Sequence, residues 1–248
     1  NQENASVIVC VRNGQDSIKN ILEDLKNQKY SGKIEFIIVD DDSNDKTKEI
    51  ILKYSNLDSR FKYVHSNEGN PNLSLKKKAI DAGVKHSKFN YLLFTDVDCR
   101  LKNKWIYTMM QQYNNGVNYI IGCSIIESPQ KFVSKFQKND FLMLMISTLA
   151  SANLKFPLAC TGQNQSYKKD LYYSLHGFDK ISHLIQGDDT IFMQLCKKSN
   201  LLNAKFSLDN ASFVSSKTHY KWKDLLLQRI RWAGDANIMW KYNALFYI

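Results

Sequence analysis

Two carboxylates follow an apolar run in this 248-residue sequence at a spacing that could support metal chemistry. Asp96 and Asp98 come directly after the run YLLFT at Tyr91–Thr95. Carboxylates two residues apart can share a hard divalent ion such as Mg²⁺ or Mn²⁺, which keeps water and phosphate oxygens as further ligands. A polar turn that ends a strand would have the same sequence, so this D-x-D pair alone does not establish a metal site.

Two further acidic clusters could recognise or activate a substrate. Four acids occur within Asp40–Asp45, where they repel one another unless a cation or a hydrogen-bond donor compensates them. A carboxylate here could accept the imide N–H of a uracil, although Ser43 or Asn44 could equally cap a helix. Asp188 and Asp189 precede another predicted helix, where an acid could be a general base or an N-cap residue.

Basic and aromatic residues at two places could bind phosphate and sugar. Lys76, with the two lysines after it, lies early in a predicted helix, where cations oppose the helix dipole and a bound pyrophosphate would offset them. The alternative for this run is a solvated basic face. Gln228, Arg231 and Trp232 share one face of a later predicted helix. Arg suits phosphate and Trp can stack on a sugar, whereas an interfacial amphipathic helix is the alternative.

Alternating strand and helix patterns predict the elements that position these side chains. Strand patterns occur at Ser6–Val11, Ile34–Val39, Phe61–His65, Tyr91–Thr95 and Tyr119–Cys123. Apolar residues at helical spacing predict helices at 18–25, 47–54, 73–84 and 105–113. These units predict an α/β fold with a mostly parallel twisted sheet flanked by helices. The acidic clusters then lie beyond the carboxyl ends of strands, where such sheets bind ligands.

The net charge of +10 indicates an anionic partner: nucleic acid, a membrane surface or a phosphorylated small molecule. Acids at the strand ends argue against a nucleic-acid-binding domain. A nucleotidyltransferase could use the same acids and metal, but the sequence VRNGQ after the first strand is a poor glycine-rich phosphate loop. Neither G-x-G-x-x-G in that place nor a P-loop occurs, so a metal and basic side chains must bind any phosphate.

The second half of the chain predicts contact with a membrane. Residues 1–215 are expected to form one domain, which holds the acidic clusters, and residues 216–248 an amphipathic helical segment. The apolar run at Phe141–Ala150 is too short to span a bilayer, and Tyr220–Trp240 is aromatic and basic. The chain also ends in the apolar run 244–248. We therefore expect a soluble fragment of a protein that segments outside this chain anchor to a membrane.

The five cysteines form no C-x-x-C pair and are widely scattered. Most of them lie in apolar stretches, which favours buried, reduced thiols over a zinc site. Reduced thiols place the chain at the cytoplasmic face of that membrane. The five histidines show no ligand spacing and are interpreted as surface or core residues.

Taken in order, these motifs resemble the family 2 glycosyltransferases with a GT-A fold. The segments that carry the resemblance are VRN at 11–13, VDDDSNDKT at 39–47, TDVD at 95–98, TGQN at 161–164, GDD at 187–189 and QRIRW at 228–232. They cover nearly the whole chain. The Q-x-x-R-W element is similar to that of the branch with cellulose and hyaluronan synthases and ceramide glucosyltransferases.

The resemblance implies an inverting, metal-dependent transfer of a sugar from a UDP-sugar to a hydroxyl of a polysaccharide or lipid acceptor. It implies Asp98 as a ligand of Mn²⁺ or Mg²⁺, with Asp96 beside it on the nucleotide-sugar, and Asp189 as the base next to Asp188. The residues it places around the donor are Cys10 and Arg12 beside the nucleotide base, Asp41 on the uracil, Lys76 at the diphosphate, and Gln228, Arg231 and Trp232 closing over diphosphate and acceptor. Gly162 to Asn164 would line the acceptor side. Residues 1–215 would then be the GT-A nucleotide-sugar-binding and catalytic domain, and residues 216–248 the helical segment with Q-x-x-R-W.

Three positions depart from the family pattern. Gly14 stands where the family usually has glutamate, Asp42 where it has glycine, and Asp188 where glutamate is commoner. These departures leave the identity of the donor more open than the reaction.

Overall fold

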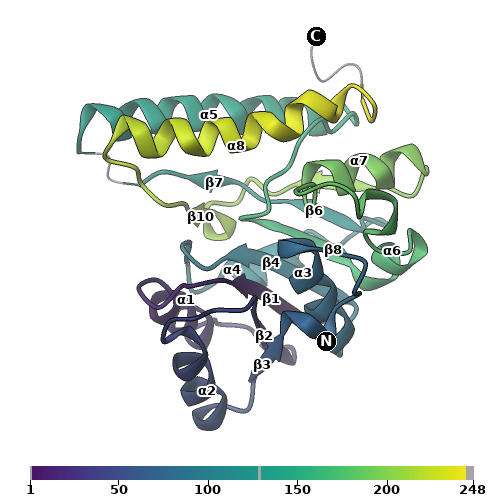
Figure 1. The fold of residues 1–248 in the computed structure, drawn as a ribbon. Helices are drawn as coiled ribbons and strands as arrows, with labels where there is room; N and C mark the ends of the chain where they lie inside the picture. Colours follow the sequence, from purple (N-terminus) through teal and green to yellow (C-terminus); the bar gives the residue numbers. More distant parts are fainter. Residues whose placement is uncertain (1, 128–129, 244–248) are drawn as a thin grey trace.

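Parallel strands form the centre of the computed structural model, which describes residues 2–127 and 130–243 (Figure 1). Within these residues one sheet has seven strands in the order β3-β2-β1-β4-β8-β6-β9. Its strands are β1 (Ala5–Val11), β2 (Ile34–Asp40), β3 (Phe61–His65), β4 (Tyr91–Asp96), β6 (Tyr119–Ile121), β8 (Gln165–Lys168) and β9 (Ala204–Phe206). Only β8 runs antiparallel to both of its neighbours, so the predicted mostly parallel sheet is confirmed.

Helices cover both faces of this sheet, as predicted. They are α1 (Ile18–Lys26), α2 (Thr47–Leu57), α3 (Leu75–His86), α4 (Trp105–Met110), α5 (Phe132–Asn153), α6 (Lys169–Ser174), α7 (Thr190–Lys198) and α8 (Trp222–Met239), with short 3₁₀ turns at Ser66–Glu68, Asp179–Ile181 and Asn210–Ser212. Alternate residues of β1 enter two different cores: Val7 packs with Leu22 and Trp105, and Ile8 packs with Ile80 and Phe94. Burial on both faces explains why β1 is apolar except at Ser6, whose buried hydroxyl donates to Glu35 at 2.6 Å.

A small second sheet brings the C-terminal part of the chain close to the end of β4. In the described residues it has the order β5-β10-β7, from Arg100–Leu101, Val214–Ser215 and Ser124–Ile125. Val214 pairs with Leu101 and Ser215 with Arg100. The segment that follows β10 is therefore next to the loop that carries Asp98.

The loop before α2 differs from the prediction. Neither Ser43 nor Asn44 caps the helix, which begins at Thr47, and the Asp45 side chain accepts a hydrogen bond from the Thr47 amide at 2.9 Å. Ser43 Oγ instead accepts from the Asn13 amide at 2.9 Å. Asp42 has φ of 55°, in the left-handed region that Gly, Asn and Asp tolerate best. That turn carries Ser43 toward the first loop.

The helices α5 and α8 lie side by side as an outer layer above β7 and β10, far from α2 (Figure 1). The Trp222 ring of α8 is 5.3 Å from the Phe136 ring of α5, and Arg229 forms an ion pair with Asp140. In the described part of the chain, no helix has the length and apolarity needed to cross a membrane. The predicted apolar end at 244–248 is outside the described residues, and the division at residue 215 stays a prediction.

Candidate active site

The predicted acidic clusters meet at one edge of the sheet because parallel strands end there together. Cys10 of β1 is opposite Asp96 of β4, and Val11 is opposite Asp40 of β2. The loop that follows β2 is tied to β1 by a hydrogen bond of 2.8 Å from the Asp41 amide to the Val11 carbonyl. The strand ends that precede the predicted acids therefore lie side by side at one edge of the sheet.

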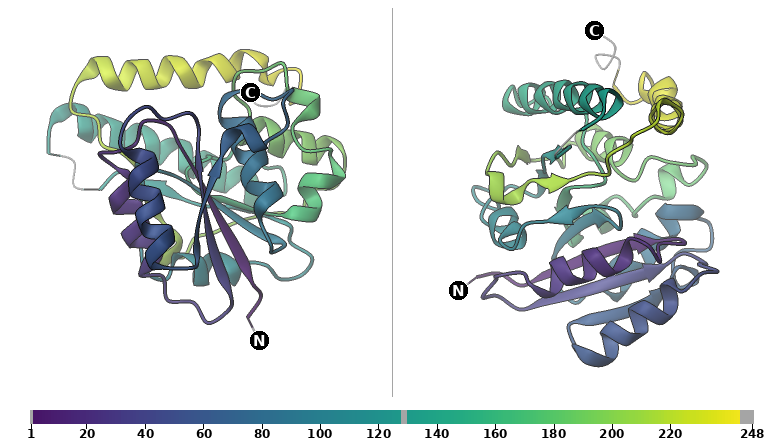
Figure 2. Two further views of the ribbon diagram at one scale, coloured as in Figure 1. Left: turned by 60° about the horizontal axis from the view of Figure 1, so that its bottom comes forward. Right: turned by 90° about the vertical axis from the view of Figure 1, so that its left-hand side faces the viewer.

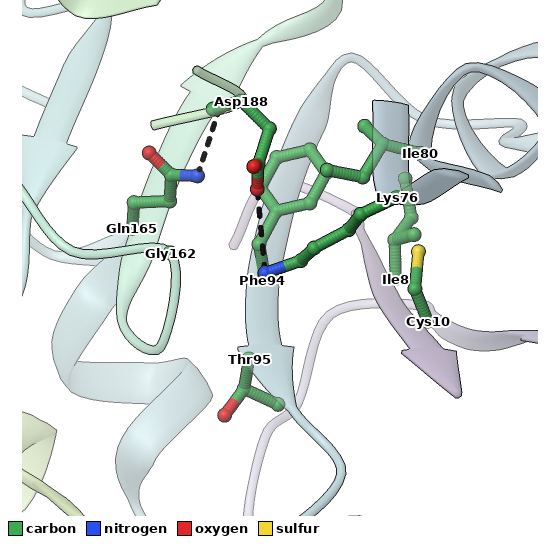
Figure 3. Close-up of a pocket in the computed structure, with 9 residues that line it drawn as sticks. All are labelled: Ile8, Cys10, Lys76, Ile80, Phe94, Thr95, Gly162, Gln165 and Asp188. Atoms are coloured by element: carbon green, nitrogen blue, oxygen red, sulfur yellow. Dashed lines mark hydrogen bonds and ion pairs between the residues drawn. The ribbon is translucent and has the colours of Figure 1, made fainter. Parts of the chain in front are cut away.

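Lys76 joins this edge to the loop before α7 (Figure 3). Its Nζ is 2.8 Å from an Asp96 oxygen and 3.3 Å from an Asp188 oxygen. Desolvation lowers the pKa of Lys76, but attraction to Asp188 and Asp96 outweighs it and holds this pKa well above its ordinary value. A permanently charged ammonium at this position can bind the phosphates of a ligand.

Asp189 begins α7 and is held by backbone amides on both sides. One oxygen accepts from the Gly162 amide at 3.0 Å, and the other accepts from the Thr190 amide. Burial and the neighbouring Asp188 raise the pKa of the Asp189 carboxyl to about 7. The residue is thus an N-cap and a carboxylate with the proton affinity of a general base, which were the two interpretations left open by the sequence.

Gly162 keeps the space between these charged groups open. A Cβ at this position would lie 3.1 Å from Lys76 Nζ and 3.5 Å from a carboxylate oxygen of both Asp188 and Asp189. By contrast, Asn164 of the same motif is fully buried and binds Trp105 Nε1 and the carbonyls of Cys123 and Ser212. Gly162 therefore faces the charged groups, whereas Asn164 fastens three segments of the interior.

A cavity of about 360 Å³ lies beside Asp98. It is lined by Asp98, Lys217, His219, Asp224, Leu227, Gln228 and Arg231. Burial and the nearby Asp96 raise the pKa of Asp98, and burial with the nearby Lys217 lowers the pKa of His219. Sequence analysis missed Lys217 and His219, because they belong to no motif. The pairing of β10 with β5 brings them to the cavity, and Gln137 of α5 bonds to the Lys217 carbonyl and the His219 amide.

Asp96 and Asp98 fit a divalent cation as a partial ligand set. Among residues 2–127 and 130–243, no cluster of three or more His, Cys, Asp or Glu side chains is arranged to hold a metal. Two carboxylates therefore have to be completed by phosphate oxygens and water, as hard cations allow. The partly desolvated Asp98 carboxyl supports this fit, because a cation would offset the cost of its charge.

The three residues predicted around the nucleotide base lie on neighbouring strands or loops. Cys10 lines a small space of about 10 Å³ with Lys76, Gly162 and Asp188, where burial raises the pKa of its thiol and keeps it neutral (Figure 3). Arg12 is exposed after β1, and Asp41 is half-buried after β2. The structure therefore brings Cys10 to the charged groups and leaves Arg12 and Asp41 at the rim.

The Q-x-x-R-W side chains divide between two environments. Gln228 and Arg231 line the cavity that contains Asp98. Trp232 instead packs on Phe141 of α5 at a ring distance of 5.8 Å, and the Arg229 guanidinium lies 4.3 Å above the Trp232 ring. Sequence spacing predicted all three motif residues on one face of the helix. In the structure Trp232 packs against α5 and does not line the cavity with Gln228 and Arg231.

Lys77 is fully buried, so the solvated basic face expected for this lysine run is wrong at its centre. Its Nζ donates to the carbonyls of Ile181 at 2.9 Å, Gln186 at 3.2 Å and Leu184. The Gln186 side chain in turn donates to the Arg231 carbonyl at 3.1 Å. Lys77 thus holds the loop that leads to Asp188, and this loop also contacts α8.

Comparison with known proteins agrees with this architecture. The chain is 27% identical over 153 residues to a GalNAc(5)-diNAcBac-PP-undecaprenol beta-1,3-glucosyltransferase of Campylobacter jejuni, which covers 57% of this chain and 48% of the relative. It is 25% identical over 146 residues to a poly-beta-1,6-N-acetyl-D-glucosamine synthase of Staphylococcus aureus, covering 58% of this chain and 34% of the relative. The chain thus spans about half or less of the length of these relatives.

A solved structure and a family profile complete the comparison. A mannosyltransferase of Pyrobaculum calidifontis in complex with GDP-Man and Mn²⁺ superposes with a TM-score of 0.67 and 16% identity, over 91% of this chain and 60% of that chain. At that identity the likeness shows the GT-A fold alone. The profile described as Glycosyl transferase family 2 matches residues 6–175, well over half of the sequence. The chain therefore belongs to glycosyl transferase family 2.

Proposed function

We propose that this chain catalyses an inverting, metal-dependent transfer of a sugar from a UDP-sugar to a hydroxyl of a polysaccharide or lipid acceptor. The observation that carries the proposal is the place of Asp189. Its carboxylate is fixed by the Gly162 and Thr190 amides at the edge where the strand-end acids and Lys76 meet. Family membership favours this reaction over nucleotidyl transfer.

Asp189 would take the proton of the acceptor hydroxyl as that oxygen attacks the anomeric carbon of the donor sugar. A pKa of about 7 lets the carboxylate accept this proton near neutral pH and pass it to solvent afterwards. The bond from the anomeric carbon to the diphosphate breaks as the new bond forms on the opposite face. One base and no carboxylate nucleophile imply a single displacement with inversion.

Positive charge for the leaving diphosphate would come from Lys76 and Arg231. Lys76 is held at the strand ends by Asp96 and Asp188, and Arg231 lines the cavity beside Asp98. A divalent ion bound by Asp96 and Asp98 would supply further neutralisation of the leaving group. Mn²⁺ accompanies the nucleotide-sugar in the Pyrobaculum mannosyltransferase, which supports a metal at this place.

The donor base and the acceptor are proposed from the rim residues and the relatives. Asp41 is the proposed acceptor of a uracil N–H, with Cys10 and Arg12 beside the base. A lipid-linked acceptor is named for the Campylobacter relative and a polysaccharide for the Staphylococcus relative. Gln228, Arg231 and Trp232 would mark the Q-x-x-R-W branch of the family. The five cysteines are free, which supports a reducing compartment at the cytoplasmic face of a membrane.

A donor screen tests the proposal. The purified chain is incubated with a panel of UDP-sugars and with GDP-mannose, each with Mn²⁺, with Mg²⁺ or with a chelator, and released nucleotide is identified. We expect metal-dependent release of UDP from at least one UDP-sugar and loss of this release in Asp189→Asn. Nucleotide release from GDP-mannose but from no UDP-sugar would contradict the proposed uridine nucleotide. Release of pyrophosphate would indicate nucleotidyl transfer.

A further inference from the structure

The outer layer of the molecule exposes large apolar side chains on two neighbouring helices. We call it the outer face and define it by six exposed side chains of α5 and α8: Phe132, Phe136, Met143, Ile146, Leu226 and Ile230. Their exposed fractions range from 47% for Phe136 to 74% for Phe132. Single exposed apolar residues are common on soluble proteins, whereas a joined surface of this kind marks a place of contact.

Helix geometry gathers these side chains on the side away from the core. In α5 the outer-face residues follow one another at spacings of four, seven and three, which makes a single stripe. The buried residues Phe141 and Met145 lie on the opposite side of the same helix. The Trp222 ring contacts Phe132 and Phe136 at 6.2 Å and 5.3 Å, so the stripes of α5 and α8 meet there. Figure 2 shows both helices at one extreme of the molecule, with the large sheet on their inner side.

The same layer is strongly basic. Residues 131–155 and 221–241 contain nine Lys and Arg against three Asp, a large share of the net charge of +10. Lys131, Lys135 and Lys223 are exposed, and one of the acids, Asp140, is paired with Arg229. Lysines around an apolar surface match a membrane, where apolar side chains enter the acyl boundary and cations meet anionic headgroups. A second copy of the chain is a poorer partner, because two basic faces would repel.

We infer that the outer face docks this protein on the surface of a bilayer that contains anionic lipid, with α5 and α8 lying parallel to the membrane plane. Each apolar side chain that enters the interface adds a favourable hydrophobic contribution, and each lysine adds attraction that salt screens. This docking is independent of the proposed donor, acceptor and base. It can therefore be tested without an activity measurement.

Vesicle flotation tests the inference. The chain is mixed with vesicles of phosphatidylcholine alone or of equal parts phosphatidylcholine and phosphatidylglycerol, at low and at high salt. We expect clear flotation with the anionic vesicles and much less with the neutral ones, and we expect salt to reduce the difference. Met143→Glu with Ile230→Glu should weaken binding to anionic vesicles about tenfold or more, because two anchors become anionic.

A matched control separates this surface from a general effect of charge. Leu52→Glu with Leu57→Glu makes the same change at two exposed positions of α2, at the other end of the molecule, and should float as the parent does. Lys135→Glu with Lys223→Glu tests the charge alone and should lower binding to anionic vesicles only. Circular dichroism confirms that each variant is folded.

Three results would overturn the inference. The first is an absence of flotation by the parent chain, or equal flotation with both kinds of vesicle. The second is unchanged flotation of the folded Met143→Glu, Ile230→Glu variant. The third is a parent that dimerises in sedimentation velocity while this variant stays monomeric, because the outer face would then bind a second copy.

Discussion

Lys76 Nζ lies 3.3 Å from Asp188 Oδ2, which joins the start of α3 to the loop before α7. This ion pair connects two parts of the site that are far apart in the sequence. Lys76 also pairs with Asp96 at the strand ends, and Asp188 is next to the proposed base Asp189. Because Gly162 has no side chain, the Lys76 ammonium and the carboxylates of Asp188 and Asp189 can lie close together. The predictions that follow test the role of each part separately.

Replacement of Asp189 tests the proposed base. Asp189→Asn keeps the shape of the side chain but cannot take a proton, so sugar transfer should fall by about 10²–10⁴-fold, the usual size of a general-base contribution. Donor affinity measured by calorimetry should be retained, because the base contacts the acceptor. Near-normal transfer by this variant would move the role to Asp188 or to another group, and Asp188→Asn provides that comparison.

The pH profile of transfer tests the state of the same carboxyl. Because burial and Asp188 raise the pKa of Asp189 to about 7, the group is mainly protonated below this pH and cannot accept a proton. We therefore expect kcat/KM to rise as the pH increases through about 7 and to level off above it. A profile that is already flat from pH 5 upward would show that the essential base has an ordinary carboxyl pKa.

Replacement of Asp98 tests the proposed metal ligand. Asp98→Ala should weaken Mn²⁺-dependent binding of UDP while the thermal unfolding midpoint stays close to that of the parent, since Asp98 borders a cavity rather than the core. Asp224→Ala is the matched control, because this acid lines the same cavity but does not follow β4. Unchanged Mn²⁺-dependent affinity in folded Asp98→Ala would remove the residue from the metal site.

Substitutions at Lys77 and Lys78 form a matched pair that tests whether Lys77 supports the loop leading to Asp188. Lys77→Met leaves the carbonyls of Ile181, Leu184 and Gln186 without their buried donor, so the free energy of unfolding should fall by about 1–3 kcal/mol. We also expect kcat to fall more than donor KM rises, because the loop carries Asp188 and Asp189.

The Lys78 ammonium donates to the exposed Asn67 side chain at 2.7 Å, so Lys78→Met should change both quantities little. Urea unfolding and steady-state kinetics of the two variants give the comparison. Equal effects of the two substitutions would show that the buried ammonium does not position the loop.

The sequence by itself predicted the sheet and the edge that carries the site. Continuous apolar runs such as VIVCV and FIIV indicate strands that are buried on both faces, as in a parallel sheet with helices on each side. Asp40 and Asp96 then had to lie at one edge of the sheet, with Asp98 in the loop beyond it, because parallel strands end together. The capping of α2 was predicted at the wrong residue, since the left-handed turn at Asp42 is a property of the folded loop.

Only the tertiary structure decided the environment of each charged or aromatic side chain. Three consecutive lysines look alike in sequence, yet Lys76 bridges two carboxylates and Lys77 is buried on three carbonyls. Trp232 packs on α5, and His219 reaches the cavity because β10 pairs with β5 and Gln137 of α5 accepts a hydrogen bond from the His219 amide. Local periodicity fixes which residues share a face of an element, but the surroundings of that face come from segments distant in the chain.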